Sequence, residues 1–217
     1  MASPDSRAHL LDAAERLFAE QGFARTTIKD IGREAGVNSA LLYYYFPDKE
    51  RLYREVLARL IGQLAARTSS RLEAGGTPEA RLQAFVEAQA AVLAANPNFP
   101  RLMARELAES DARHAVEQIQ RLAATSFRRL CDLIREGQAA GTFRRGLDPR
   151  FAAISIVAQV AYFFVARPAV GILLEAGPGG PTPAVVRSYA RHAADFALAG
   201  LAASPRVRAS RRSRRVT

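Results

Sequence analysis

The 217-residue sequence contains no tryptophan, two methionines and a single cysteine, Cys131. One thiol cannot form a disulfide within the chain, and it cannot build a zinc or iron–sulfur site that needs several thiolates. The longest apolar run, residues 154–166, is shorter than the roughly 20 residues that a bilayer-spanning helix requires. No basic start followed by an uninterrupted apolar segment opens the chain, so a signal peptide is not expected. We therefore expect a cytoplasmic protein with no membrane partner.

The sequence also lacks the residue patterns of common catalytic sites. Its three histidines, His9, His114 and His192, lie far apart, and none falls in a metal-binding or nucleophile motif. The glycine-rich stretch at residues 177–183 lacks the lysine and the strand–helix context of a phosphate-binding loop. We therefore expect no cofactor, no metal and no catalytic residue, and an all-helical enzyme is kept as an alternative.

The formal net charge is +10, but the excess is concentrated at the C-terminal end. Residues 1–60 hold nine Lys and Arg against nine Asp and Glu, whereas residues 204–217 hold six Arg and no acid. We expect this basic tail to be disordered, because it cannot bury a core. It is either a solvated extension or a non-specific contact to phosphates. A DNA-binding architectural protein that uses the tail is a further alternative.

Helical periodicity dominates the rest of the sequence, and alternating runs rich in Val, Ile and Thr are absent, so we expect an all-α fold. A first helix is predicted over residues 6–21, where Gly22 would end it. Thr27, followed three residues later by Asp30, is predicted to cap a second helix that ends at Gly36.

A third, short helix is predicted from Asn38 or Ser39 to Phe46, where Pro47 follows, and Asp48 should cap a long fourth helix. Prolines, glycines and other helix-ending residues divide the chain into nine or ten helices in all. The fourth helix is expected to reach residue 71, and a later helix should begin at residue 149 and kink or break at Pro168. The other helices are expected over residues 78–95, 99–109, 111–140 and 183–201.

Two short helices joined by a tight turn that contains glycine form the pattern of a helix-turn-helix. Gly36 allows the left-handed conformation that such a turn needs. Three consecutive tyrosines cannot all face inward, because successive helix positions are about 100° apart, and Tyr45 is the expected core member. The small core of this unit is predicted to consist of Ile31, Ala35, Val37, Leu42 and Phe46.

The outward residues of the third helix are the predicted contacts to DNA. The N-terminal residues of a recognition helix reach base edges in the major groove. Ser39 can hydrogen-bond a base there, whereas Ala40 and Leu41 can contact a thymine methyl group. Contacts to phosphate, which fix the register, are expected from Tyr43, Tyr44, Lys49 and Thr27.

The segment TTIKDIGREAGVNSALLYYYFPDKERLY, residues 26–53, resembles the DNA-binding domain of the TetR family of bacterial regulators. The positions match in order and without gaps, and the resemblance extends back through AERLFAEQGF. Asn38 falls at the family's capping position and is counted among the DNA-binding residues. Gly32 stands where alanine is usual, and Leu41 where a small or hydroxyl residue is common, which leaves the operator preference open. The matching positions are Thr26-Thr27, Ala35-Gly36-Val37, Leu42-Tyr43, Phe46 and Lys49-Glu50.

The resemblance implies a homodimer that binds double-stranded operator DNA and a small-molecule effector of unknown identity. We expect a repressor that an effector releases from a palindromic operator, with a transcriptional activator of the same fold as an alternative. A shift of the long fourth helix is the expected switching motion. The predicted domains are a three-helix helix-turn-helix domain at residues 1–48 and a helical-bundle domain for ligand binding and dimerisation at residues 49–203. The tail follows at residues 204–217.

The effector pocket should be largely apolar with a few polar groups. Arg105, Glu106 and His114 could anchor a ligand, or they could be surface or salt-bridged residues. Ordinary core packing is the alternative for every pocket residue. The candidates are Phe85, Gln89, Phe99, Met103, Phe127, Cys131 and Phe163.

The dimer surface should consist of apolar helix faces, and the helices at residues 151–165 and 185–201 are the best candidates. Small residues on the last helix would permit close approach of a second copy. The alternative is that the same face packs inside the chain. The expected interface residues are Val186, Tyr189, Ala193, Phe196, Ala197 and Gly200.

Overall fold

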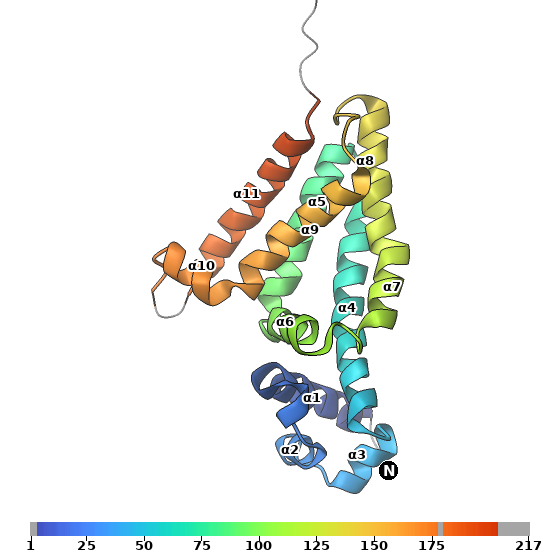
Figure 1. Ribbon diagram of the computed structural model, residues 1–217, viewed down its shortest axis with the longest axis vertical. Helices are drawn as coiled ribbons and strands as arrows, with labels where there is room; N and C mark the ends of the chain where they lie inside the picture. The colour runs from blue at the N-terminus through green and yellow to red at the C-terminus, as the bar shows by residue number, and fades with distance from the viewer. Residues whose placement is uncertain (1–3, 178–179, 204–217) are drawn as a thin grey trace, which may run out of the picture.

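The computed structural model describes residues 4–177 and 180–203, and every regular element in these two ranges is a helix (Figure 1). The prediction of an all-α fold is therefore confirmed. The basic tail at residues 204–217 lies outside the described residues. The elements are α1 (Pro4–Arg25), α2 (Ile28–Glu34), α3 (Ser39–Tyr45), α4 (Lys49–Leu72), α5 (Pro78–Ala95), α6 (Asn98–Ser110), α7 (Val116–Leu122), the π-helical turn η1 (Ala123–Phe127), α8 (Arg128–Ala140), α9 (Pro149–Val165), α10 (Arg167–Leu173) and α11 (Pro183–Leu201).

The first three helices form a small unit at one end of the molecule (Figure 1). Apolar side chains of α1 that are three or four residues apart face its interior, where Leu10, Ala14 and Phe18 are buried. Gly22 breaks α1 with a left-handed φ of 82°, and helical residues resume up to Arg25. The buried hydroxyl of Thr26 donates to the Gly22 carbonyl at 2.8 Å, which closes the helix end.

Helix α4 connects this unit to the rest of the chain (Figure 1). With 24 residues it is roughly 36 Å long at about 1.5 Å of rise per residue. Its first half packs on α1 and buries Tyr53 and Val56, and its second half packs on α5, α7, η1 and α8. The predicted domain boundary after residue 48 falls at the N-cap Asp48, whose side chain accepts from the Arg51 N–H at 2.7 Å.

The larger, C-terminal part surrounds α5, which packs against α4, α8, α9 and α11. Helix α6 crosses below this group and packs on α1, so that it lies between the two parts (Figure 1). No single helix in the described ranges is both long and apolar enough to cross a membrane; α9 and α10 reach that length only as a pair bent by 82°.

One predicted helix starts at a different residue, and one predicted break is confirmed. The helix expected from residue 111 begins only at Val116, because Asp111 (φ 50°) and Ala112 (φ 60°) adopt the left-handed region and end α6. The chain resumes as α7, passes through the π-helical turn and continues as α8. The helix that begins at Pro149 breaks at Ala166, and Pro168 then lies in the first turn of α10, as the fixed φ of proline allows.

Replacing glycine with alanine should have opposite effects on stability at two positions of the chain. A Cβ at the buried Gly137 would lie 2.2 Å from a ring carbon of Phe143, whereas a Cβ at the exposed Gly62 would meet nothing within 4 Å. We expect Gly137→Ala to lower the free energy of unfolding by about 1–3 kcal/mol through overpacking. Gly62→Ala, the control, should raise it by about 0.5–1 kcal/mol, because alanine loses less backbone entropy in a helix. Urea denaturation measures both, and equal effects would contradict the packing at Gly137.

Candidate functional site

Helix α3 has one face fixed in the core. Leu42 and Phe46 are fully buried, as is Ile31 on α2. The turn between the two helices is held by the Val37 N–H, which donates to the Gly32 carbonyl at 2.9 Å, and Gly36 adopts the predicted left-handed φ of 67°. The predicted core of the helix-turn-helix is confirmed for these side chains, so the orientation of α3 is set by packing.

The other face of α3 is open to solvent. Tyr44 is 75% exposed and Tyr43 is 52% exposed, and Ser39 and Ala40 are exposed as well. Tyr45 is half-buried and packs against the core, as predicted. Leu41, also half-buried, lies between the two faces.

The polar residues at the two helix starts act as caps. Asn38 Oδ1 accepts from the Leu41 N–H at 2.8 Å. Thr27 Oγ1 accepts from the Asp30 N–H at 3.1 Å, and Asp30 Oδ2 accepts from the Thr27 N–H at 3.3 Å, which is the predicted capping box. The Thr27 hydroxyl also donates to Asp30 Oδ2 at 2.6 Å. The hydrogen bond from Thr27 lowers the pKa of the Asp30 carboxyl. Contact of Asn38 or Thr27 with DNA stays a prediction.

Lys49, at the start of α4, bonds the end of α1. Its ammonium group lies 2.9 Å from the carbonyl oxygen of Phe23, 3.1 Å from that of Thr26 and 3.5 Å from that of Ala24. This side chain therefore ties α4 to α1, and its contact with a phosphate stays a prediction.

Two of the four arginines in α1–α3 pair with acids of the same unit, Arg16 with Glu34 at 3.0 Å and Arg33 with Asp30 at 2.7 Å. Lys29, in the first turn of α2, is exposed and has no ion pair among the described residues. It was not among the predicted DNA contacts, although the sequence distinguishes it, because no acid lies three or four residues from Lys29 on either side.

A buried polar cluster joins α4 to α6. The Glu106 carboxylate accepts from the backbone N–H of His114 at 2.8 Å and lies 3.0 Å from its ring Nδ1. Arg113 Nε donates to His114 Nε2 at 3.2 Å, so Nδ1 must carry the proton given to Glu106. Burial, with this carboxylate beside it, raises the pKa of the Tyr53 phenol. The Tyr53 ring also packs edge-on against the His114 ring, at 5.1 Å between ring centroids. Glu106 and His114 are thus hydrogen-bonded to each other and buried, which contradicts a surface position.

Arg105, next to Glu106, joins α6 to α1. Its guanidinium donates to the carbonyl oxygens of Ala19 at 3.3 Å and Glu20 at 3.1 Å, and it pairs with Glu109 at 2.8 Å. Arg105 therefore helps to hold the two parts of the chain together and contacts no ligand cavity described below.

Three of the seven predicted pocket residues, Phe85, Gln89 and Phe127, line one cavity of about 80 Å³ between α4, α5, α8 and α9. The other lining residues are Leu64, Thr68, Leu122, Ser126, Leu130 and Val157.

The other four predicted pocket residues pack in the core and do not line this cavity. Phe163 stacks on Tyr189 at 4.0 Å between ring centroids. Cys131 is buried, with Sγ 3.8 Å from the Pro149 carbonyl oxygen, and burial raises the pKa of its thiol. Phe99 is buried and Met103 is half-buried against the core. For these four residues the alternative of ordinary core packing holds.

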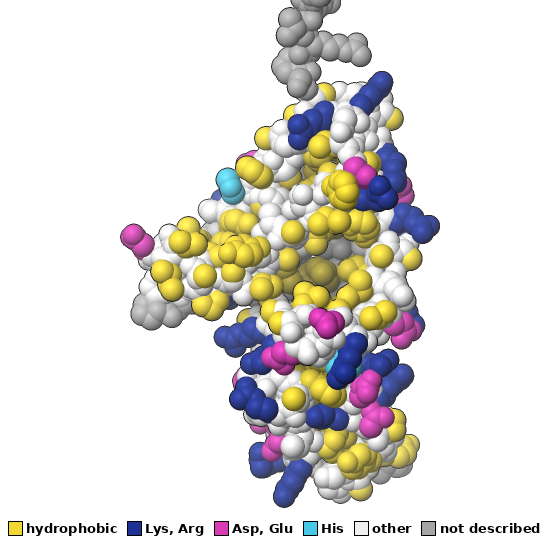
Figure 2. Space-filling view, in the orientation of Figure 1, with side chains coloured by type: hydrophobic (Ala, Val, Ile, Leu, Met, Phe, Trp, Pro, Cys, Tyr) yellow, Lys and Arg dark blue, Asp and Glu magenta, His cyan; other side chains and the backbone are white. Residues whose placement is uncertain are grey.

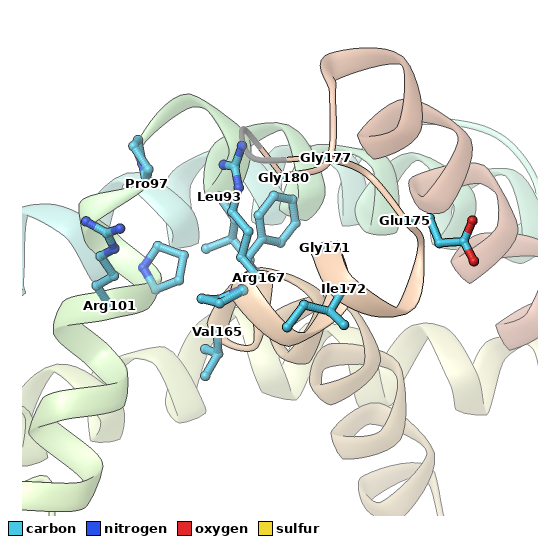
Figure 3. Close-up of a pocket in the computed structure, with 13 residues that line it drawn as sticks. Leu93, Pro97, Arg101, Val165, Arg167, Gly171, Ile172, Glu175, Gly177 and Gly180 are labelled. Atoms are coloured by element: carbon cyan, nitrogen blue, oxygen red, sulfur yellow. The ribbon is translucent and has the colours of Figure 1, made fainter.

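A larger cavity of about 950 Å³ lies between the α5–α6 corner and the bend from α9 to α10 (Figure 3). Arg101 and Arg167 both line it, and Arg167 donates to the Pro181 carbonyl oxygen at 3.3 Å. None of its residues was predicted to line a pocket, although Pro168 was predicted to kink or break its helix. The lining residues are Leu93, Pro97, Pro100, Arg101, Phe164, Val165, Arg167, Pro168, Gly171, Ile172, Glu175, Gly177 and Gly180.

Helices α9 and α11 present apolar side chains to solvent. In Figure 2 hydrophobic side chains gather across the middle of the visible face, over α9 and α10, whereas charged side chains surround the N-terminal part below. Phe196 on α11 is 67% exposed, and Gly200 is exposed as well. The exposed large apolar residues of α9 are Phe151, Ile154, Tyr162 and Val165.

The prediction of the dimer interface was wrong for two residues. Ala193 is 1% exposed and Ala197 is also buried, because α11 packs mainly on α5 inside the chain and these small side chains allow the close approach. Tyr189 is half-buried and donates to the Gln159 carbonyl at 2.7 Å. Val186 lines a third cavity, of about 660 Å³, between α5 and α11.

Comparison with protein families gives two matches along the chain. Residues 10–56 match the model for bacterial regulatory proteins of the tetR family, and residues 78–196 match a tetracyclin repressor-like C-terminal domain. The HTH-type transcriptional repressor KstR2 of Rhodococcus jostii is 30% identical over 147 residues, which cover 67% of this chain and 72% of KstR2. The HTH-type transcriptional regulator BetI of Rhizobium meliloti is 32% identical over 127 residues, which cover 58% of this chain and 61% of BetI.

Solved structures match over nearly the whole chain. KstR2 of Mycobacterium tuberculosis superposes with a TM-score of 0.74 at 23% identity, covering 93% of this chain and 97% of that one. A regulatory protein of the same family from Rhodococcus RHA1 gives 0.77 at 19% identity, covering 94% and 100%. At these identities the likeness concerns the fold, and it confirms a helix-turn-helix unit followed by a helical domain.

The junction at Tyr53 predicts a specific loss of stability in alkali. An unfolded tyrosine ionises near pH 10, whereas the pKa of the folded Tyr53 phenol is raised above that value. The stability from this group is therefore complete below about pH 10 and decreases as the pH rises further, by up to about 1.4 kcal/mol per pH unit. The free energy of unfolding of Tyr53→Phe should fall less steeply above pH 10 than that of the wild type.

Tyr44→Phe, which removes an exposed hydroxyl on α3, is the control and should follow the wild-type curve. Urea denaturation between pH 9 and 11 measures all three proteins. Parallel curves for the wild type and Tyr53→Phe would show that the Tyr53 hydroxyl is not buried beside Glu106.

Proposed function

The chain belongs to the tetR family of bacterial regulatory proteins and is a DNA-binding transcriptional regulator, and we propose that it is a repressor which a small molecule releases from a palindromic operator. The repressor assignment is supported by relatives that are named repressors. The same names, which describe regulators, support the proposal that the chain has no catalytic activity. Since its target is DNA, we place its action in the cytoplasm.

The observation that carries the proposal is the division of α3 into a buried and an open face. Leu42 and Phe46 fix the helix, and Tyr43 and Tyr44 stand out from it although aromatic side chains are usually covered. A fixed helix with an exposed N-terminal half suits insertion into the major groove, where the first residues of such a helix reach base edges.

Each exposed residue has a proposed role on DNA. Ser39 and Ala40, with Leu41 beside them, would read bases, and the hydroxyls of Tyr43 and Tyr44 would bond phosphates. Lys49 would bond a phosphate from the start of α4. We add Lys29 as a further phosphate contact, because its ammonium group is exposed and no acid neutralises it among the described residues.

A palindromic operator needs two copies of the chain, with half-sites about 34–36 Å apart or a multiple of that distance. We propose that the second copy covers the exposed apolar face of α9 and α11. Phe151, Tyr162 and Phe196 are each more than half exposed there. Removing such side chains from water favours association by roughly 25 cal/mol per Å² of apolar surface.

Release requires that an effector bind the conformation unable to hold DNA more tightly. We propose that the effector enters the cavity beside Gln89 and displaces α4, which lines that cavity through Leu64 and Thr68. The same helix carries Tyr53, whose buried phenol lies beside Glu106 on α6. A shift of α4 would therefore change the position of the attached α1–α3 unit.

Substitutions on the open face should separate base reading from phosphate binding. Leu41→Thr and Ser39→Ala should change which duplexes are preferred, with about 1–3 kcal/mol of discrimination at an affected base pair. Lys29→Met should weaken binding to all duplexes and reduce the slope of log affinity against log salt by about 0.9, the value for one phosphate contact. Fluorescence anisotropy with a set of labelled duplexes at several salt concentrations measures both effects.

Lys49→Met is the matched comparison for Lys29→Met. It should lower the melting temperature of the protein, because Lys49 ties α4 to α1, whereas Lys29→Met should leave the melting temperature unchanged. An unaltered duplex preference in the Ser39 and Leu41 variants, together with an unaltered salt slope for Lys29→Met, would contradict the proposed docking.

A further inference from the structure

One polar atom in the core of the helical domain has no hydrogen-bond partner. Gln89 on α5 is 2% exposed, and its Nε2 donates to the carbonyl oxygen of Val157 at 3.1 Å. Its other amide atom, Oε1, is buried, and no donor among the described residues reaches it. Because a carbonyl can only accept, the bond to Val157 fixes which end of the amide is nitrogen. The unpaired atom is therefore an acceptor.

A buried acceptor without a donor is unfavourable and calls for an explanation, such as a water or a ligand. Gln89 lines the cavity of about 80 Å³ between α4, α5, α8 and α9. A molecule in this cavity could therefore supply the missing donor.

The rest of the cavity wall offers neither a charge nor another strong polar contact. The Thr68 hydroxyl donates to the Leu64 carbonyl at 2.8 Å, and Ser126 Oγ lies 2.5 Å from Ser69 Oγ. An anion would find no cation here and would face the Gln89 oxygen, so a carboxylate or phosphate is disfavoured. The remaining lining residues are all apolar: Leu64, Phe85, Leu122, Phe127, Leu130 and Val157.

The cavity is small in this structure but has one irregular wall. Its volume is about half of the 150 Å³ or so that holds a benzene molecule in a protein core. Leu122, Ser126 and Phe127 come from η1 and the residue before it, where the chain forms a π-helical turn. Such turns occur often at functional sites. Phe127, which is only half-buried, could move outward and enlarge the cavity.

We propose that this cavity binds a neutral molecule with an apolar body and one hydroxyl or amide N–H group, which donates to Gln89 Oε1. The inference rests on the proposed function, because it names the chemical class of the effector. The donor satisfies the amide oxygen, and the apolar body fills the space between Phe85, Leu130 and Val157. The preference for a donor follows from Gln89 alone, because the other walls do not distinguish an alcohol from a hydrocarbon.

The test compares three small aromatic probes that differ in one group: 4-fluorophenol, 4-fluorotoluene and 4-fluorobenzoate. Fluorine NMR titration against the full-length protein, without DNA, gives their dissociation constants. We expect 4-fluorophenol to bind about tenfold more tightly than 4-fluorotoluene, the difference that one satisfied buried acceptor makes. The benzoate should bind least.

Gln89→Met, which keeps the shape and removes the acceptor, should abolish the preference for the phenol. Gln83→Met, on the exposed side of the same helix, is the matched control and should keep it. Equal affinities for phenol and toluene in the wild type, a preference that survives in Gln89→Met, or tighter binding of the benzoate would overturn the proposal. So would the absence of binding by all three probes, which would mean that water satisfies Gln89. If Gln89→Met does not fold, the wild-type ratio decides.

A second measurement separates this inference from the proposed function. Duplex binding is measured with and without 4-fluorophenol at a saturating concentration. If the phenol binds with the expected dependence on Gln89 but leaves duplex affinity unchanged, the ligand class stands and the proposed release mechanism is wrong.

Discussion

The position of the N-terminal unit depends on one buried carboxylate, that of Glu106 on α6. It accepts from the backbone and the ring of His114, and it lies beside the buried phenol of Tyr53 on α4. A buried hydrogen-bonding group that loses its partner is destabilising by about 1–3 kcal/mol, and by more when the group is charged. A movement of α4 away from α6 would disturb these buried contacts, so we expect the two helices to move together.

This constraint connects the cavities to the DNA-reading face. Arg105, one residue before Glu106, bonds the carbonyls of Ala19 and Glu20, so α6 holds α1 as well as α4. The first turn of α6 also lines the 950 Å³ cavity through Arg101, and α4 lines the cavity beside Gln89. Both cavities thus border helices that position α3. The recognition helix itself has no freedom of its own, since Leu42 and Phe46 fix it in the core.

The features that depend on nearby residues were predictable from the sequence. Gly36, Leu42, Phe46 and the Thr27–Asp30 capping box follow from turn chemistry and helical spacing, and all were confirmed. Features that depend on distant segments were not predictable. Periodicity gives the apolar face of a helix but not its partner, so Ala193 and Ala197 were assigned to a dimer although they pack on α5. Lys49 likewise contacts carbonyls that lie 23 to 26 residues away in the sequence.

Selection of bound duplexes from a random pool by the purified protein tests the central claim most directly, that the outer face of α3 reads DNA as part of a two-fold assembly. The account predicts enrichment of an inverted repeat whose half-sites are separated by about 10–10.5 base pairs or a multiple of that. A pool that stays random at moderate salt, or that is enriched only in a single unrepeated site, would contradict it.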